Sequence, residues 1–344
     1  MTTIYDIAKK ANVSAMTVSR VVNNTGRISE ATRKRVKKVM EEMNYVPNSM
    51  ARSLVLQKTK MLSLLITDIT NPFFTTLARG AEDTAKRYGY KLLFGNSDED
   101  YAKEKDYVDM ILSTRVDGVL FAPAGDRSLE PLQQLQNHQI PFVLLDREVP
   151  GMEADMVLGD SKEGARMLVG HLIELGHRRI ALINGAPDVS TARLRSAGYL
   201  EAHKLAGLPV DESLVIYANY RDFHEDSALD GLLRLPSPPT AIFAANNFLA
   251  IGVIQALRQR GYRVPEDLSV VCFDDFGPAE SLNPFLTVAS QQAYQFGSLG
   301  MQLLIERIDS ESDLPRRKLV LPSELRIRSS TAAPTSINTK AADH

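Results

Sequence analysis

The sequence contains no tryptophan and only one cysteine, Cys272, among 344 residues. A single cysteine cannot form an internal disulfide, and the apolar run around it, Ser269 to Phe273, predicts a buried strand in which the thiol packs. No stretch of 18 apolar residues is present, and the first residues form neither a basic nor an apolar signal-peptide region. We therefore expect a protein that neither spans a membrane nor is exported, located in the cytoplasm.

Motifs for cofactor and metal chemistry are also missing. The sequence has no GxGxxG or P-loop motif, so binding of a dinucleotide or a nucleoside triphosphate by those motifs is not expected. The six histidines, at positions 138, 171, 177, 203, 224 and 344, show no metal-ligand spacing, and His177 is expected to make a structural contact. No pair of nucleophile and base is visible, although catalytic triads assemble in space. We expect no metal, no cofactor and no enzymatic activity.

The charge is unevenly distributed along the chain. Residues 1–60 hold 12 of the 40 Lys and Arg but 4 of the 42 Asp and Glu, a net charge of +8, which leaves −10 for the remainder. A basic segment before an acidic body favours a polyanion as partner of the basic segment, although a merely solvated surface would have the same composition. The length suggests two or three domains.

Residues 1–46 show the spacing of three short amphipathic helices. Thr3 with Asp6 fits a capping box, and Ser14 and Ser29 are suited to cap the second and third helices. The apolar positions with helical spacing are Ile4, Ile7, Ala8 and Ala11, then Val18, Val21 and Val22, then Val36, Val39, Met40 and Met43. Two short helices joined by a tight turn are typical of a helix-turn-helix, with a generic three-helix bundle as the alternative.

If the second helix enters a major groove, its first exposed side chains reach the base edges. Ala15, Met16 and Arg20 are the exposed candidates. Arg20 could bond a guanine edge with two hydrogen bonds, whereas Ala15 and Met16 offer apolar contact, for example to a thymine methyl group.

The segment 47–60 joins this head to the body. Pro47 and Asn48 predict the start of a helix, but about nine residues are fewer than the roughly 12 to 15 that make an isolated helix marginally stable. We expect this hinge helix to order only when another surface packs against it.

Three motifs in the first 55 residues resemble the lactose repressor (LacI) family of bacterial transcription regulators. They are Thr3 to Ala8, Val13 to Asn23 and Asn44 to Asn48, and Ala51 to Leu54 resembles the hinge helix of that family. The resemblance, which extends to about residue 330, implies a homodimer on a pseudo-palindromic operator. It implies that DNA is contacted by Thr3, Tyr5, Ser14, Ala15, Met16, Thr17, Ser19, Arg20, Asn23, Asn48, Ala51, Arg52 and Leu54. Leu54 would wedge into the minor groove, and packing on its own body is the alternative.

In residues 61–330, short apolar runs alternate with helical patterns. The predicted strands are 62–66, 91–94, 118–121, 142–145, 180–183, 241–244, 269–273 and 287–289, with helices at 74–88 and 248–260 among those between them. This alternation predicts parallel sheets covered on both faces, in two doubly wound lobes. The fold class is thus an all-α helix-turn-helix head and an α/β body, which the resemblance likens to periplasmic sugar-binding proteins. Residues 331–344 are expected to form a flexible tail.

Polar and aromatic residues follow the predicted strands, where parallel sheets bind ligands. They resemble the binding cage of ribose-type periplasmic proteins, and the candidate ligand-binding residues are Asp68, Asn71, Phe73, Phe74, Asp146, Arg147, Asp160, Arg195, Phe223, Asn246, Asp274 and Gln291. Taken singly, each also suits a helix cap, an internal ion pair or the core. The acidic run 98–100 is expected to be a solvated surface.

Two positions depart from that cage: Ala122 replaces an asparagine, and Asn247 follows Asn246 where an aspartate is usual. We expect a repressor that senses ribose or a similar small sugar. The alternatives are a sugar-binding or sugar-processing protein without a regulatory role on DNA, or a regulator that responds to a purine or a sugar phosphate.

Overall fold

A computed structural model describes residues 2–45, 59–220, 226–277, 284–310, 312 and 314–335. The chain divides into two compact units, Met1–Lys60 and Met61–His344. The hinge candidates Asn48, Ala51, Arg52 and Leu54 and the ligand candidate Phe223 lie outside the described residues.

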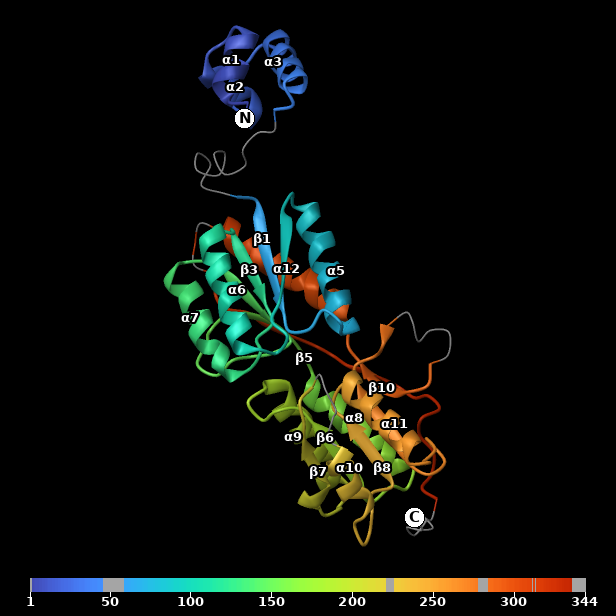
Figure 1. Ribbon diagram of the computed structural model, residues 1–344. Helices are drawn as coiled ribbons and strands as arrows, with labels where there is room; N and C mark the ends of the chain where they lie inside the picture. The colour runs from blue at the N-terminus through green and yellow to red at the C-terminus, as the bar shows by residue number, and fades with distance from the viewer. Residues whose placement is uncertain are drawn as a thin grey trace. The chain divides into compact units, whose positions relative to one another are not determined.

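The described part of the head contains three helices, α1 (Ile4–Ala11), α2 (Ala15–Asn23) and α3 (Glu30–Glu42) (Figure 1). Thr3, Ser14 and Ser29 cap them as predicted, and Thr3 forms the capping box with Asp6. The apolar faces meet in one small core, centred on the fully buried Ile7, Val18 and Val36. Local capping and periodicity therefore account for the head.

The first lobe of the body is a six-stranded sheet in the order β11-β5-β4-β3-β1-β2, and all its neighbouring strands are parallel. Its strands are β1 (Met61–Ile66), β2 (Lys91–Asn96), β3 (Gly118–Phe121), β4 (Phe142–Leu145), β5 (Asp155–Gly159) and β11 (Lys318–Leu321). Its helices are α5 (Pro72–Arg87), α6 (Tyr101–Thr114), α7 (Leu129–Asn137) and α12 (Ala293–Asp309), with a 3-10 turn, η1, at Asp126–Ser128. Because successive strand residues face opposite sides, Leu64 packs under α5 and α12 while Leu65 packs under α6 and α7.

The second lobe repeats this topology, in the order β12-β10-β9-β8-β6-β7. Its strands are β6 (Ile180–Asn184), β7 (Val215–Tyr217), β8 (Ala241–Ala244), β9 (Ser269–Phe273), β10 (Thr287–Ser290) and β12 (Glu324–Arg326). Its helices are α8 (Ser161–Glu174), α9 (Ser190–Leu205), α10 (Asp226–Leu233) and α11 (Asn247–Gln259), with a 3-10 turn, η2, at Glu212–Leu214. The chain crosses between lobes after β5, after β10 and after β11, so three connections join them.

The prediction of two doubly wound lobes is confirmed, but several strands and the start of the predicted tail need correction. Strands β5, β7, β11 and β12 were not predicted, and β12 runs antiparallel to β10. The predicted flexible tail does not begin at residue 331, because Thr331, Ala332 and Thr335 are hydrogen-bonded to the second lobe. His177 makes the structural contact expected of it, since its ring bonds Thr240, Ser269 and the Ala332 carbonyl.

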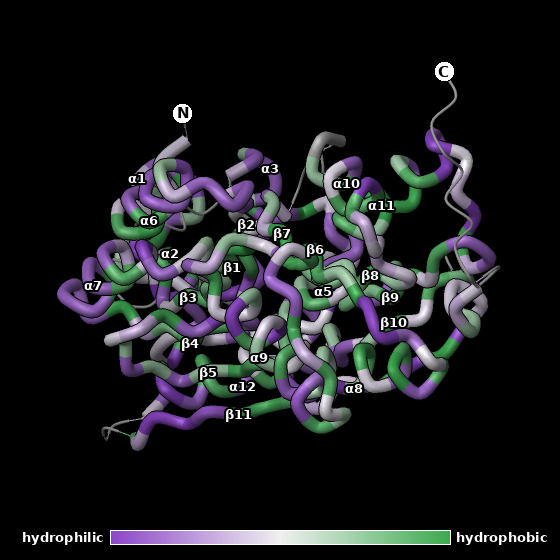
Figure 2. Tube along the Cα trace, turned by 90° about the horizontal axis from the view of Figure 1, so that it is seen from below, coloured by the Kyte–Doolittle hydropathy of each residue, from purple (hydrophilic) through white to green (hydrophobic). Residues whose placement is uncertain are grey.

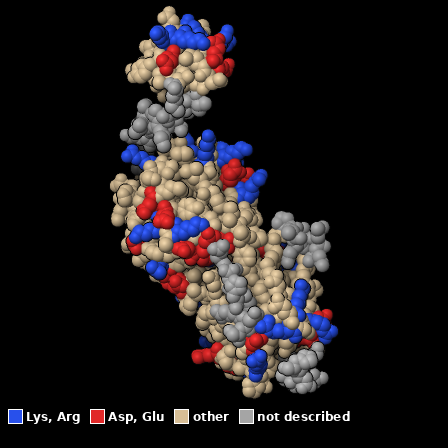
Figure 3. All heavy atoms as spheres, viewed as in Figure 1, with Lys and Arg blue, Asp and Glu red and all other residues tan. Residues whose placement is uncertain are grey.

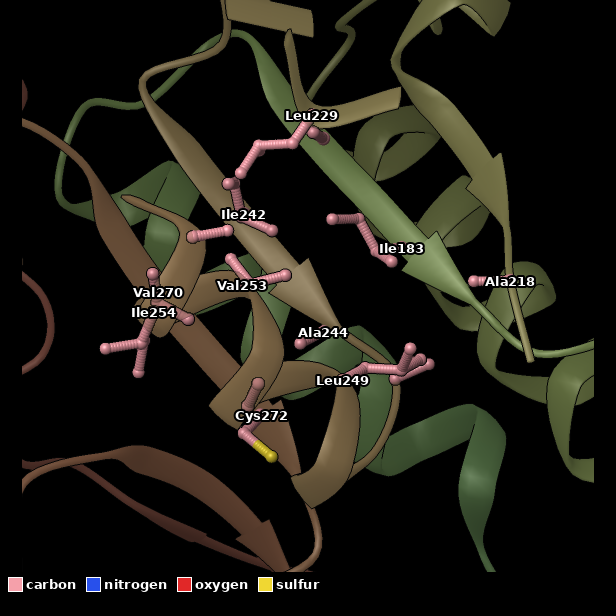
Figure 4. Close-up of a cluster of buried hydrophobic side chains, with 14 of the residues drawn as sticks. Ile183, Ala218, Leu229, Ile242, Ala244, Leu249, Val253, Ile254, Val270 and Cys272 are labelled. Carbon is pink, nitrogen blue, oxygen red and sulfur yellow. The ribbon is translucent and has the colours of Figure 1, made fainter. Parts of the chain in front are cut away.

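Cys272 is fully buried in β9, as predicted (Figure 4). It lies among aliphatic side chains such as Ile242, Val253 and Val270, which fill the space between the sheet and α11. Helices such as α3 and α7 are largely hydrophilic along their length (Figure 2). In the described part of the chain, no helix is both long and apolar enough to cross a bilayer.

Candidate functional sites in the head and in the body

In the head, the start of α2 presents its side chains to solvent. Ser14 accepts a hydrogen bond from the Thr17 amide at 3.2 Å, and the two hydroxyls lie 2.9 Å apart, which fixes the first turn of the helix. Met16 is 64% exposed and Arg20 is exposed as well. Ala15 is half-buried because it packs against the head core, so the expectation that it is exposed is wrong.

The other head candidates have mixed environments. Tyr5 on α1 is 73% exposed, whereas Thr3 is engaged in capping. Asn23 donates to the Ser19 hydroxyl at 3.3 Å, and its own side-chain oxygen is buried without a partner in the described part of the chain. Lys and Arg side chains gather over the upper part of the head in Figure 3. The exposed start of α2, on a head that carries basic side chains, suits contacts with phosphates and bases.

In the body, two aspartates occupy equivalent places in the two lobes. Asp146 follows β4 and Asp274 follows β9, and both adopt left-handed backbone angles, with φ of 66° and 69°. Each amide donates to the next strand, to the Val157 carbonyl at 2.9 Å and to the Ala289 carbonyl at 3.0 Å respectively. Both carboxylates are buried, and burial raises their pKa values, that of Asp274 to about 6.

Arg147 is held in the first lobe by a buried ion pair. Its two terminal nitrogens donate to the Glu99 carboxylate at 2.7 and 2.8 Å, and one of them also donates to the carbonyls of Pro123 and Ala124. Its Nε lies 3.5 Å from the Asp146 carboxylate and has no hydrogen-bond partner among the described residues. Glu99 therefore points inward.

The expectation that the acidic run 98–100 is a solvated surface is wrong for Glu99 alone. Asp98 pairs with Lys103 at a partly exposed position, and Asp100 is exposed and caps α6. Glu99 could have been suspected from the sequence, because it lies just beyond the carboxyl end of β2, where site residues of parallel sheets gather.

Arg195 of α9 approaches Asp274 in the second lobe. Its guanidinium lies 3.7 Å from the carboxylate and 3.9 Å above the Phe273 ring, and it donates to the Ala245 carbonyl at 2.6 Å. Gln291, in the second crossover, donates to Asp274 at 2.7 Å. Arg195 Nε and Gln291 Oε1 are buried without hydrogen-bond partners in the described parts of the chain.

Several remaining candidates bond mainly to their own surroundings. Asp68 accepts hydrogen bonds from Thr70, Asp160 caps α8, and Asn246 caps α11 while donating to the Tyr220 carbonyl. Asn71 caps α5, and its side-chain oxygen also accepts from Asn247 at 3.0 Å, across the lobes. The departure at Asn247 thus provides a contact between lobes.

The predicted aromatic residues are mostly packed inside. Phe73 and Phe74 both lie in the first-lobe core, edge-on to each other, and Phe73 also packs against Phe296. Phe73, Asp274 and Gln291 line a cavity of about 570 Å³, whereas Phe74 does not.

Several hydrogen bonds join the two lobes directly, and the residues that form them were not predicted from the sequence. Asp126 receives two hydrogen bonds from Arg193, at 2.8 and 3.0 Å, and its amide donates to the Asp188 carbonyl at 3.0 Å. The Glu148 amide donates to the Ser190 hydroxyl at 3.1 Å. These contacts hold the lobes together around the buried charges.

Comparison with known proteins identifies the family to which this architecture belongs. Residues 3–48 match the model described as bacterial regulatory proteins, lacI family, and residues 169–331 match a periplasmic binding protein-like domain. The transcriptional regulator DegA of Bacillus subtilis (strain 168) is 39% identical over 96% of this chain and 98% of its own length. The chain belongs to the lacI family of bacterial regulatory proteins. A transcriptional repressor PurR from Vibrio atlanticus (strain LGP32) is 35% identical over 96% of this chain and 98% of its own.

Solved structures of lacI-family regulators share the fold. The lac repressor dimer bound to operator and an anti-inducer has a TM-score of 0.82 at 26% identity, covering 96% of this chain and 99% of its own. A complex of the regulator CelR with cellobiose has a TM-score of 0.71 at 32% identity, covering 96% and 100%. A family member from Enterococcus faecium with bound ribose has a TM-score of 0.71 at 28% identity, covering 80% and 100%. The protein is therefore a DNA-binding transcriptional regulator, as its relatives are, and not an enzyme.

Proposed function

We propose that this regulator is a homodimeric repressor of bacterial carbohydrate genes, acting in the cytoplasm, whose operator affinity is controlled by a small neutral sugar between the body lobes. The observation that carries the proposal is a set of buried polar atoms without hydrogen-bond partners among the described residues: Arg147 Nε, Arg195 Nε and Gln291 Oε1. They come from the first lobe, the second lobe and a crossover. Sugar hydroxyls both donate and accept hydrogen bonds, so one small polyol can satisfy donors and acceptors of this kind together.

The charge balance favours a neutral ligand over a phosphorylated one. Arg147 is already neutralised by Glu99, and Arg195 lies beside Asp274, with Asp146 as a third carboxylate nearby. A phosphate would add its negative charge to a buried site in which the two arginines already face three carboxylates, Glu99, Asp146 and Asp274. A neutral hydroxyl ligand avoids this cost.

The sugar class is supported by related structures, since CelR was solved with cellobiose and the Enterococcus faecium regulator with ribose. The best candidate is ribose or a similar monosaccharide, recognised by Asn71, Asp146, Arg147, Arg195, Asn246, Asp274 and Gln291, with Phe73 at the mouth. Phe223, outside the described residues, would contribute a second aromatic face.

On DNA, two heads would read a pseudo-palindromic operator through Met16 and Arg20, with Ser14, Thr17 and Tyr5 holding phosphates. The segment 47–60 would form paired hinge helices that insert Leu54 into the minor groove. A coupling of about 1 to 3 kcal/mol between sugar and hinge, typical of allosteric sites, would suffice to control operator affinity.

The test is calorimetry with D-ribose, other pentoses, hexoses, sugar phosphates and purines, followed by operator binding in the presence of each ligand that binds. We expect a neutral sugar to bind, and we expect Arg195→Ala to abolish binding because the buried Asp274 then loses its cationic partner. Arg166→Ala, which removes a surface pair with Glu163, is the matched control and should bind normally. Binding of only a purine or a sugar phosphate would refute the neutral-sugar assignment.

A further inference from the structure

Tyr220 packs against the core of the second lobe, three residues beyond the end of β7, and is 6% exposed. Its ring covers Gly185 so closely that a Cβ atom on that glycine would lie 2.3 Å from two ring carbons. The guanidinium of Arg147, from the first lobe, lies over the same ring, 5.9 Å from its centroid. The ring therefore contacts Gly185, just beyond β6, and faces an arginine of the opposite lobe.

The position of the ring is fixed by a chain of hydrogen bonds. The Tyr220 hydroxyl donates to Asn184 Oδ1 at 3.3 Å. Asn184 is itself immobilised, because its amide nitrogen donates to the Ala192 carbonyl and the Ser196 hydroxyl at 2.8 and 2.9 Å. The Tyr220 carbonyl accepts from Asn246 at 3.2 Å. A ring held at both its hydroxyl and its backbone is a rigid wall.

The surroundings of the phenol place it within the proposed ligand site. Burial raises its pKa, while the charges of Arg195 and Arg147 oppose that rise. The Nε atoms of the same two arginines have no hydrogen-bond partner among the described residues, so the tyrosine borders the atoms proposed to bind hydroxyls.

We propose that Tyr220 sets the upper size limit of the ligand, because its ring closes one end of the interlobe site and leaves room for a single sugar ring. The inference rests on the proposed function, since it assumes a neutral sugar at this site. Replacement of the ring by a small side chain would open space continuous with the site, into which a second sugar ring could extend.

The experiment measures binding of D-ribose, D-glucose and cellobiose to the full chain by calorimetry. We expect the wild type to bind a monosaccharide and not cellobiose, and Tyr220→Ala to bind cellobiose at least tenfold more tightly than the wild type does. Tyr220→Phe keeps the ring and should retain the size limit. Tyr217→Ala removes an exposed tyrosine of β7 and serves as the matched control, with wild-type binding of all three sugars.

Gly185→Ala tests the same size limit by changing the position of the Tyr220 ring. Its backbone is not in the left-handed region, so the added methyl group acts mainly by displacing the Tyr220 ring toward the ligand. We expect monosaccharide affinity to fall at least tenfold, and we expect the same substitution to change affinity less than twofold when Tyr220 is already alanine. Tyr220→Leu replaces Tyr220→Ala if the alanine variant does not fold, as judged by its melting curve.

The outcomes separate the two proposals. Cellobiose binding by the wild type overturns the size limit and leaves the neutral-sugar function standing. A wild type that binds a monosaccharide, with a folded Tyr220 variant that gains no disaccharide, also overturns the size limit alone. If neither the wild type nor the variants bind any sugar, both proposals fall.

Discussion

Replacing Glu104 with glutamine should change how the stability of the body depends on pH. Glu104 lies on α6 with no exposed surface, and its Oε2 accepts a hydrogen bond from the Ala124 amide at 2.7 Å. Its Oε1 is buried with no hydrogen-bond partner in the part of the chain that the structure describes. Burial is the main reason why its pKa rises from an ordinary 4.5 to about 7, against the opposing hydrogen bonds of Ser128 and Ala124.

The sign follows from linkage between proton binding and folding. Because the folded pKa lies above the unfolded one, the contribution of Glu104 is fully present below pH 4.5 and is lost as pH rises through 7. Each unit between the two pKa values is worth about 1.4 kcal/mol, so the total loss is about 3 kcal/mol. Glutamine has nearly the same shape and can accept the same amide hydrogen bond, but it never carries the buried charge.

The measurement is thermal unfolding by circular dichroism at pH 5 and at pH 8, since the chain lacks tryptophan for fluorescence. Relative to the wild type, Glu104→Gln should gain about 2 to 3 kcal/mol of stability between these pH values, or roughly 3 to 5 °C in melting temperature. Glu82→Gln, at an exposed position of α5, is the matched control and should follow the wild type. Parallel pH profiles for Glu104→Gln and the wild type would refute the reasoning.

Three further predictions concern the interlobe contacts, the ligand site and the head. Asp126→Asn should weaken the closed form of the lobes by about 0.5 to 1 kcal/mol, as expected for a half-exposed bidentate pair, and sugar affinity by up to about fivefold in calorimetry. The charge-exchanged double variant, Asp126→Arg with Arg193→Asp, should restore the sugar affinity. If the affinity does not recover, the pair does not stabilise the closed form. An ionised Asp274 is a stronger hydrogen-bond acceptor than the protonated acid, so the sugar affinity of the wild type should rise as pH passes through about 6. An equally steep rise in Asp274→Asn would show that this carboxylate is not the group responsible. Arg20→Ala should cost about 1 to 3 kcal/mol in operator binding, measured by anisotropy of labelled DNA, and an equal loss on non-operator DNA would show that Arg20 reads no base.

The head was predictable because its signals are local. Thr3, Ser14 and Ser29 each precede a helical apolar pattern, and each caps a helix in the structure. Ala15 was the exception, because its packing against the core depends on how α2 lies across the other helices, which periodicity does not specify.

In the body, the central strands were predictable from their apolar runs, and the edge strands were not. The sheet-edge strand β11 alternates exposed and half-buried residues over four positions, and β12 has three residues, so neither has the continuous apolar run of a central strand. β7 is also short and lies at a sheet edge. Their pairing is decided by partners far along the chain, as for Lys318 beside Met156.

The candidate site was found in part by one rule, that ligands bind at the carboxyl ends of parallel strands. That rule placed Asp146 and Asp274 correctly at strand ends. It could not reveal that Arg147 pairs with Glu99, because 48 positions separate the two residues and only the fold brings them together. Tyr220 was missed because its neighbours in sequence give no sign that its ring would face Gly185.

The repeated topology of the lobes explains why the site can recognise an asymmetric ligand. Asp146 and Asp274 have equivalent strand ends and nearly equal backbone angles, so the backbone presents two similar carboxylates from opposite sides. The next residue breaks this symmetry, since Arg147 pairs with Glu99 inside the first lobe whereas Asp275 bonds Arg326 and Arg328 at the edge of the second. Asp146 therefore has Arg147 of its own lobe beside it, whereas Asp274 has Arg195, which comes from α9. A sugar with hydroxyls on two faces would meet a different arrangement of donors at each carboxylate. Exchanging the ligand end for end would place its hydroxyls against differently arranged donors, so a single orientation should be preferred.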